Sequence, residues 1–303
     1  MKVNIFIPVY HPERKFLSLL RMLKVQKDVN FVVHVIDSAA MGDEYKKLLS
    51  QLNHATYQQI EASSFNHGGT RQECIDQYPD SEICVFLTQD AILFDEYSIA
   101  RLVRAFDDPS VGCAYGRQIP HPNAKPFAVF ARLFNYKEDS YTFSYDDRTQ
   151  HGIKTAFCSN SFAAYRHSAM DNIGGFPNDT ILSEDMYVAA KMLMAGWKIS
   201  YVSSAKVYHS HDYSVIDEFK RYFDIGVFHE RESWIREKFG QAEGEGGRFV
   251  LNEVKYLYES SPMLIPSMIV RDGMKYLGYR LGLKERFIPR AIKKRFSMNS
   301  RFW

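Results

Sequence analysis

The sequence of 303 residues has few cysteines, little net charge and no long apolar run. Its four cysteines lack the short paired spacing of zinc motifs and of disulfide-rich scaffolds, which predicts a reducing compartment. A net charge of +2 gives no overall signal for nucleic-acid binding. No window reaches the roughly 18 apolar residues of a membrane-spanning helix, and Met1–Tyr10 is too short a run for a signal peptide. We therefore expect a cytoplasmic protein that is soluble or peripheral to a membrane.

What the chain does contain is an alternation of strand and helix patterns from Val3 to Ile119. Apolar runs at Val3–Val9, Phe31–Ile36 and Ile83–Leu87 are typical of buried parallel strands. Between the runs, apolar residues recur with helical spacing, as they do in Phe16–Leu23. The pattern predicts a doubly wound, mainly parallel sheet flanked by helices.

From Ser214 onward the pattern is all-helical, so we expect a sheet domain at 1–213 and a helical C-terminal region at 214–303. Gln241–Gly247, rich in Gly and Glu, predicts a linker between two of these helices. Lys284–Trp303 holds seven Lys or Arg against one acid, and aromatic and apolar residues are interspersed just before and within it. This mixture suits an anionic membrane surface, at roughly 1 kcal/mol per basic residue. A packed helix with a solvated basic face, or a homodimer contact, is the alternative.

Polar residues collect where the predicted strands end, the position at which ligands bind to open α/β sheets. Asp37 could accept the N3–H of a pyrimidine base or simply hold a turn. Asp90 follows an apolar strand, where a buried carboxylate needs a cation or an internal partner; capping of the next helix is the alternative. His67–Arg71 combines glycines that permit close backbone approach with a cation, although a helix N-terminus with a surface Arg would look the same.

Two later motifs also carry chemistry. Ser183 is expected to cap a helix, and the two acids after it suit the helix dipole. If those acids face a cleft, Asp185 is positioned as a general base. His209 and His211 end a strand beside another acid and could ligate Mn²⁺, or could be polar surface.

Read in order, these motifs resemble inverting glycosyltransferase family 2. The resemblance rests on Ile7–Tyr10, Val35–Ser38, Leu87–Asp90 and Ser183–Asp185. One departure is Thr88, which stands where the family's Asp-x-Asp motif has its first Asp. A finer resemblance is to the bacterial rhamnosyltransferases of cell-surface polysaccharide assembly. It is carried by Phe65–Arg71, Leu87–Ala91, Cys158–Arg166, Ile173–Pro177 and Ile288–Trp303.

This resemblance implies a GT-A fold with a helical C-terminal extension, and it implies a role for each matching residue. The residues implied in nucleotide binding are Pro8, Tyr10, Asp37, Arg71 and Gln89. The residues implied in holding Mg²⁺ or Mn²⁺ are Asp90 and one of His209 and His211. Asp185 would be the catalytic base, and the residues implied in acceptor binding are Ser159, Asn160 and Glu184.

The implied reaction is the transfer of L-rhamnose, with inversion, from dTDP-β-L-rhamnose to a lipid-linked glycan in cell-wall or surface polysaccharide synthesis. The Gln-x-x-Arg-Trp motif of processive members is absent, and Arg231–Trp234 has the wrong spacing, so we expect one or a few sugars per encounter. One alternative is a UDP-hexose donor. The other is a non-catalytic glycan- or nucleotide-binding module, although such a module would not need a base and a metal site together.

Overall fold

A computed structural model describes residues 1–241 and 243–303, without the side chain of residue 243. Within this part of the chain, nine strands form one sheet in the order β3-β2-β1-β4-β8-β6-β9-β5, with β7 paired to β9. The strands are β1 Val3–Val9, β2 Phe31–Asp37, β3 Ala55–Gln59, β4 Ile83–Leu87, β5 Ile92–Leu93, β6 Val111–Ile119, β7 Tyr141–Phe143, β8 Phe162–Arg166 and β9 Lys198–Tyr208.

Most of the sheet is parallel, as the sequence predicts. Strands β1 to β4 run in one direction, and β6 and β9 share that direction. The exceptions are β5 and β7, which pair antiparallel with β9, and β8, which lies antiparallel between β4 and β6. The direction of β8 was not predictable from its pattern, because a strand buried on both faces is uniformly apolar whichever way it runs.

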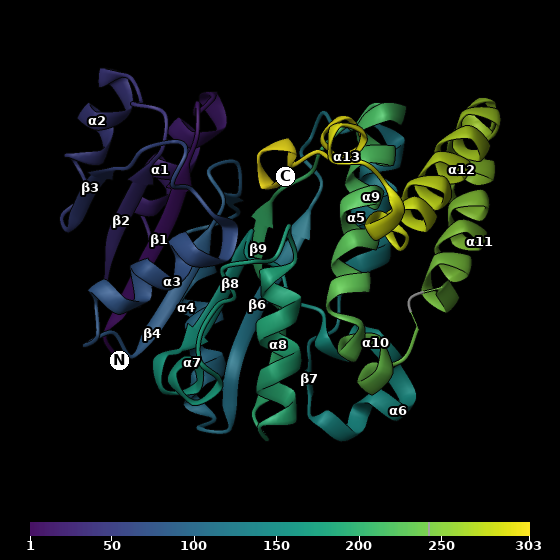
Figure 1. Ribbon diagram of the computed structural model, residues 1–303. Helices are drawn as coiled ribbons and strands as arrows, with labels where there is room; N and C mark the ends of the chain where they lie inside the picture. The colour runs from purple at the N-terminus through teal and green to yellow at the C-terminus, as the bar shows by residue number, and fades with distance from the viewer. Residues whose placement is uncertain (242) are drawn as a thin grey trace.

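Helices cover both faces of the sheet (Figure 1). The first eight are α1 Arg14–Lys24, α2 Asp43–Leu49, α3 His67–Gln77, α4 Ser98–Val103, α5 Pro126–Asn135, α6 Arg148–His151, α7 His167–Ile173 and α8 Glu184–Met194. Within β1, Ile5 and Ile7 belong to one hydrophobic cluster and Phe6 to the other, because successive strand side chains point to opposite faces. The protein therefore has two apolar layers with the sheet between them.

The chain after Ser214 is helical, as predicted. Its helices are α9 Val215–Arg231, α10 Ser233–Phe239, α11 Glu243–Ser260, α12 Ile265–Gly282 and α13 Arg290–Phe296. Ser214 begins this region with a capping box in which its hydroxyl and the Asp217 carboxylate satisfy each other's backbone N–H groups. The division of the chain at residues 213 and 214 stays a prediction.

The predicted linker at Gln241–Gly247 is wrong over most of its length. Residue 242 lies outside the described residues, and from Glu243 the chain is already in α11. Three glycines in the first turns do not prevent the helix, because Phe249 of α11 packs against Phe130 and Phe134 of α5. Tertiary packing thus outweighs the low helix propensity of glycine. No described helix combines the length and the apolar character needed to span a membrane.

Helices α9 and α12 cross at very short range. A Cβ atom added to Gly278 would lie 2.4 Å from the Phe219 carbonyl oxygen, and one added to Gly282 would lie 2.2 Å from that of Phe223. A Cβ atom added to Gly226 of α9 would likewise lie 2.3 Å from the Tyr279 carbonyl oxygen. Glycine is therefore required at three positions of this contact.

The end of the chain folds back onto the carboxyl edge of the sheet (Figure 1). We call Ser297–Trp303 the C-terminal strap. The buried Asp224 carboxylate of α9 accepts the backbone N–H groups of Met298 and Asn299, at 2.9 and 3.1 Å. Arg301 then donates to the hydroxyl oxygen of Tyr10 at 3.1 Å. The strap thus connects α9 to the end of β1.

Part of the tail that could have faced a membrane is packed against the protein instead, as the alternative of a packed helix implied. Trp303 is 9% exposed and its carbonyl oxygen accepts a hydrogen bond from Arg290, while Lys293 pairs with the buried Glu285. Tyr279, one of the aromatic residues just before Lys284, is also buried. The remaining apolar and basic residues of the predicted surface are largely exposed, among them Tyr276, Leu277, Lys284, Arg286, Phe287, Lys294 and Arg295.

Candidate active site

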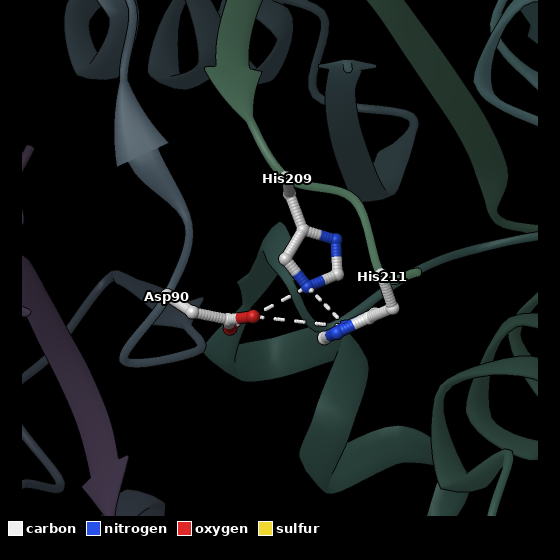
Figure 2. A group of neighbouring side chains, drawn as sticks. All are labelled: Asp90, His209 and His211. Atoms are coloured by element: carbon white, nitrogen blue, oxygen red, sulfur yellow. Dashed lines mark hydrogen bonds and ion pairs between the residues drawn. The ribbon is translucent and has the colours of Figure 1, made fainter. Parts of the chain in front are cut away.

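Asp90 and both candidate histidine ligands, His209 and His211, meet at the carboxyl edge of the sheet (Figure 2). Asp90 lies in the turn between β4 and β5, and His209 and His211 follow β9. Strand β5 pairs with β9 through Ile92 and Tyr208, which places the turn beside the two histidines. His209 Nε2 lies 3.4 Å from Asp90 Oδ1, and His211 Nε2 lies 3.6 Å from Asp90 Oδ2. The candidate ligand atoms all lie within 4.8 Å of one another.

A hydrogen bond at Nδ1, on the side of the ring away from Asp90, fixes the orientation of His209. Its Nδ1 lies 2.8 Å from Gln118 Oε1, which also accepts a hydrogen bond from Arg132. Since that oxygen can only accept, Nδ1 carries the proton and Nε2 presents a lone pair toward Asp90. Donation of the second ring N–H to an oxygen acceptor is typical of a metal-ligating histidine.

The electrostatics of the cluster suit a cation. Burial opposes ionisation of Asp90, but His209, His211 and Thr88 outweigh it and hold the pKa of Asp90 below its ordinary value. Burial, followed by the proximity of His209, lowers the pKa of His211 to about 3. Burial likewise lowers the pKa of His209, so two neutral imidazoles and one carboxylate face a common point, and the two Nε2 atoms lie 3.1 Å apart, within hydrogen-bonding distance. This donor set fits a divalent metal that accepts nitrogen and oxygen ligands.

A second cluster surrounds the N-terminus of α8. Asp185 accepts the backbone N–H of Asn160 at 3.0 Å and that of Met186 at 2.8 Å. Glu184 is buried, lies 3.1 Å from an Arg71 guanidinium nitrogen and accepts from the Asn160 side-chain amide at 2.8 Å. The structure thus brings together four of the predicted site residues from three parts of the chain.

The two adjacent acids have opposite electrostatic environments. Burial disfavours the charge of Glu184, yet Arg71, His67 and Asn160 outweigh it and lower its pKa. Burial, with the charge of Glu184 next, raises the pKa of Asp185 to about 7. Asp185 is also partly exposed, whereas Glu184 is 5% exposed. A proton acceptor near neutral pH is therefore accessible at Asp185.

Ser183 does not cap α8 in the predicted way. It occupies the N-cap position but has φ 60° and ψ 30°, and its side chain makes no capping hydrogen bond. A left-handed conformation is unfavourable for a serine and is found where the surroundings impose it. The Asp185 carboxylate bonds the Met186 N–H at this helix end instead.

The end of β1 is held by Gln89. The Gln89 side chain accepts from the Tyr10 backbone N–H at 2.8 Å and donates to the Tyr10 carbonyl oxygen at 3.0 Å. Tyr10 itself is 45% exposed and carries Arg301 over its ring, whereas Pro8 is half-buried in the strand. In this structure Gln89 therefore positions the loop at Tyr10, and its predicted contact with a nucleotide stays a prediction.

Asp37 holds the turn after β2, which was the alternative to its predicted contact with a nucleotide base. It is fully buried and accepts hydrogen bonds from the backbone of Ala39 and Met41 and from the Tyr57 hydroxyl. Arg71 is likewise committed to Glu184 and to the His67 carbonyl oxygen, and is not a surface side chain. The nucleotide contacts of both residues remain predictions.

Hydrogen bonds on either side of the Ser159–Asn160 peptide connect Asp185 with the candidate metal ligand His209. Ser159 Oγ accepts from Gln118 Nε2 at 2.8 Å, and Gln118 supports His209. The next residue, Asn160, contacts both Glu184 and Asp185. Gln118 and Arg132 were missed in the sequence; the only signal was a glutamine inside the apolar run of β6, where it is 1% exposed.

A mainly parallel sheet with an Asp–His–His cluster at its carboxyl edge, together with the comparisons below, assigns the chain to the glycosyltransferases of the GT-A fold. The family profile described as Glycosyl transferase family group 2 matches residues 84–223. The chain belongs to glycosyltransferase family 2.

Two curated relatives extend over most of the chain. The O-antigen chain rhamnosyltransferase RfbN of Salmonella typhimurium is 44% identical over 303 residues, covering 100% of this chain and 96% of the relative. The O-antigen chain rhamnosyltransferase WbaN of Salmonella anatum is 43% identical over 269 residues, covering 89% of this chain and 85% of the relative.

Solved structures support the fold. The mannosyltransferase PcManGT of Pyrobaculum calidifontis, solved with GDP-Man and Mn²⁺, is similar with a TM-score of 0.59 at 16% identity, over 99% of this chain and 84% of that one. TarS 1-349 of S. aureus, solved with UDP-GlcNAc, has a TM-score of 0.57 at 16% identity, over 95% and 92% of the two chains.

Proposed function

We propose that the protein transfers L-rhamnose from dTDP-β-L-rhamnose, with inversion, to a lipid-linked glycan of surface polysaccharide synthesis. The observation that carries the proposal is Asp185, a partly exposed residue whose carboxyl group has a raised pKa. It accepts a hydrogen bond from the backbone of Asn160. The preceding residue, Ser159, contacts Gln118, which in turn holds His209. The choice of rhamnose is supported by the names of the two Salmonella relatives.

In the proposed reaction Asp185 accepts the proton of the acceptor hydroxyl as its oxygen attacks the anomeric carbon. Glu184 stays ionised against Arg71, and its charge keeps Asp185 basic enough for this role. Asp90, His209 and His211 would hold Mg²⁺ or Mn²⁺, which when bound supplies positive charge for a diphosphate leaving group. Tyr10, positioned by Gln89, lies where the nucleotide would bind at the end of β1.

The test is a thermal-shift screen against dTDP, UDP, GDP and CDP, each with and without Mn²⁺. A ligand at a hundredfold excess over its Kd stabilises the folded state by about 2.7 kcal/mol. Stabilisation by dTDP that requires Mn²⁺ is the expected result. A response to UDP alone would favour a UDP-hexose donor, and no response to any nucleotide would contradict the proposal.

We also propose that the protein works at the cytoplasmic surface of a membrane. The support is an exposed group of apolar and basic residues at the end of α12 and after it, including Phe287 at 74% and Tyr276 at 63% exposure. Aromatic and basic residues together favour an anionic interface. The double variant Arg286→Ser/Phe287→Ser should sediment less with anionic vesicles than wild type; equal sedimentation would contradict the proposal and leave a dimer contact as the use of this surface.

A further inference from the structure

The C-terminal strap, Ser297–Trp303, places a cation at the carboxyl edge of the sheet. The Arg301 guanidinium donates to the Tyr10 hydroxyl oxygen at 3.1 Å and to the Ala62 carbonyl oxygen at 3.3 Å, and it lies over the Tyr10 ring. Tyr10 follows β1, and Ala62 follows β3. Because β2 pairs with both of these strands, Arg301 joins two loops that lie on either side of the end of β2.

The end of β1 lies between the residues predicted to contact the two ends of the donor nucleotide. Strand β1 is flanked by β2, which ends in Asp37, and by β4, which Asp90 follows. Asp37 is the predicted contact of the base, and Asp90 is a candidate metal ligand. Gln89, next to Asp90, holds the Tyr10 backbone. A nucleoside diphosphate that reaches from Asp37 to Asp90 would carry its phosphates across the end of β1, beside Arg301.

Within the described residues, no carboxylate pairs with Arg301. The side chain is exposed, and its hydrogen-bond partners in this part of the chain are the two neutral oxygens of Tyr10 and Ala62. A guanidinium has five N–H donors, so donors remain for a ligand without any movement of the side chain. Charge-assisted hydrogen bonds from Arg to phosphate are roughly twice as strong as neutral ones. An exposed guanidinium with neutral partners is therefore suited to a phosphate.

Arg71, the cation that the sequence predicts at the nucleotide, is held by other groups. It is 5% exposed, lies 3.1 Å from Glu184 and donates to the His67 carbonyl oxygen. Withdrawing it toward a ligand would leave the buried Glu184 carboxylate without its ion-pair partner, which is strongly unfavourable. A cation for the phosphates therefore has to come from another residue, and Arg301 is positioned to supply it.

The C-terminal strap is anchored on both sides of Arg301. Before it, the fully buried Asp224 carboxylate accepts two backbone N–H groups of the strap, and the Asn299 side chain donates to the Ile181 carbonyl oxygen at 3.1 Å. After it, Trp303 is buried. The backbone at Arg301 is thus fixed by contacts with the body of the protein, so its guanidinium is held at the end of β1 before any ligand binds.

We infer that Arg301 is a donor-binding residue whose guanidinium pairs with a phosphate of the bound nucleoside diphosphate, and that the C-terminal strap positions it for this contact. The inference rests on the proposed function. A preorganised cation at this place also stabilises the negative charge that develops on the leaving diphosphate. The end of the sequence then has a role at the site itself, separate from the exposed residues proposed for the membrane surface.

The test compares dTDP with thymidine, which lacks the phosphates, on the full chain with Mn²⁺. The affinity of dTDP is measured by calorimetry and that of thymidine by competition with dTDP. Arg301→Ala should weaken dTDP by about tenfold, the usual loss for one charged hydrogen bond, and leave thymidine unchanged. Arg301→Lys keeps the charge without the planar fork and should lose less affinity than Arg301→Ala. Added salt should reduce the difference between wild type and Arg301→Ala, because the pair is exposed.

Arg21→Ala is the matched control, because Arg21 is an exposed arginine of α1 that makes no hydrogen bond or ion pair with the described residues. It should bind dTDP as wild type does, and the Tm of each variant without ligand verifies the fold. Unchanged dTDP affinity in a folded Arg301→Ala variant, or equal losses for dTDP and thymidine, would overturn the inference alone. A wild-type protein that binds no nucleotide would contradict the proposed function as well.

Discussion

Glu184 and Asp185 are adjacent acids in one helical turn, and their neighbours shift their pKa values in opposite directions. The Arg71 guanidinium stabilises the charge of Glu184, whereas burial and the charge of Glu184 disfavour ionisation of Asp185. If Asp185 is the base, Asp185→Asn should lower kcat by about 10²-fold or more. The measurement is steady-state transfer at saturating donor, with dTDP affinity as the control for folding. Near-normal turnover in a folded variant would exclude Asp185 as the base.

The raised pKa of Asp185 determines the direction in which the reaction rate and the stability change with pH. Rate should rise with pH through a limb near 7 rather than near the ordinary 3.8, because only the ionised carboxylate accepts a proton. For stability, the folded protein binds this proton more tightly than the unfolded chain, so Asp185 contributes most below about pH 4 and loses that contribution toward pH 7 and above. The Tm of Asp185→Asn relative to wild type should therefore increase between pH 4 and pH 8. A constant difference across this range would show that the pKa of Asp185 is not raised.

Gln118 acts on the candidate metal site without belonging to it. Its Oε1 receives the His209 Nδ1–H, so Gln118→Leu should free the imidazole to change tautomer and orientation. Loss of such a partner typically weakens metal binding by about 10–100-fold. Mn²⁺ titration in the presence of dTDP measures the effect. Gln118→Glu, which keeps an acceptor oxygen, should retain more affinity than Gln118→Leu, and the reverse order would contradict this role.

At the scale of elements, the crossing of α9 and α12 sets the shape of the C-terminal region. Gly278→Ala would force a methyl group against the backbone of α9, and overpacking of this kind costs about 1–3 kcal/mol. Gly273→Ala on the same helix is the control: it meets nothing within 4 Å and should stabilise the protein by about 0.5–1 kcal/mol. Urea unfolding of both variants checks the pair, and equal effects would mean that the helices separate more easily than the contact implies.

The C-terminal strap is a second element that matters for the site. Asp224 holds its backbone and Arg301 reaches Tyr10, so the last residues of the chain lie beside the predicted nucleotide position. A basic stretch in a sequence does not distinguish a membrane-facing tail from such a strap. The distinction depends on a partner that is buried in another element, here the Asp224 carboxylate.

For the whole molecule, the sequence predicted what periodicity and motif order can encode. The sheet and the helical region after Ser214 followed from apolar runs and helical spacing, and the pairing of Asp90 with a histidine at 209 or 211 followed from the family resemblance. The direction of β8 and the glycine-rich start of α11 did not, because each depends on contacts between distant segments. Gln118 was not predictable for the same reason: its role exists only where β6 and the end of β9 lie side by side.

The most direct test of the central claim is the transfer of radiolabelled rhamnose from dTDP-β-L-rhamnose into the lipid extract of bacterial membranes by the purified protein with Mn²⁺. We predict that label enters the lipid fraction, that a chelator prevents it and that Asp185→Asn fails to support it. Absence of label from dTDP-rhamnose, with transfer from another nucleotide sugar under the same conditions, would contradict the assignment of a rhamnosyltransferase.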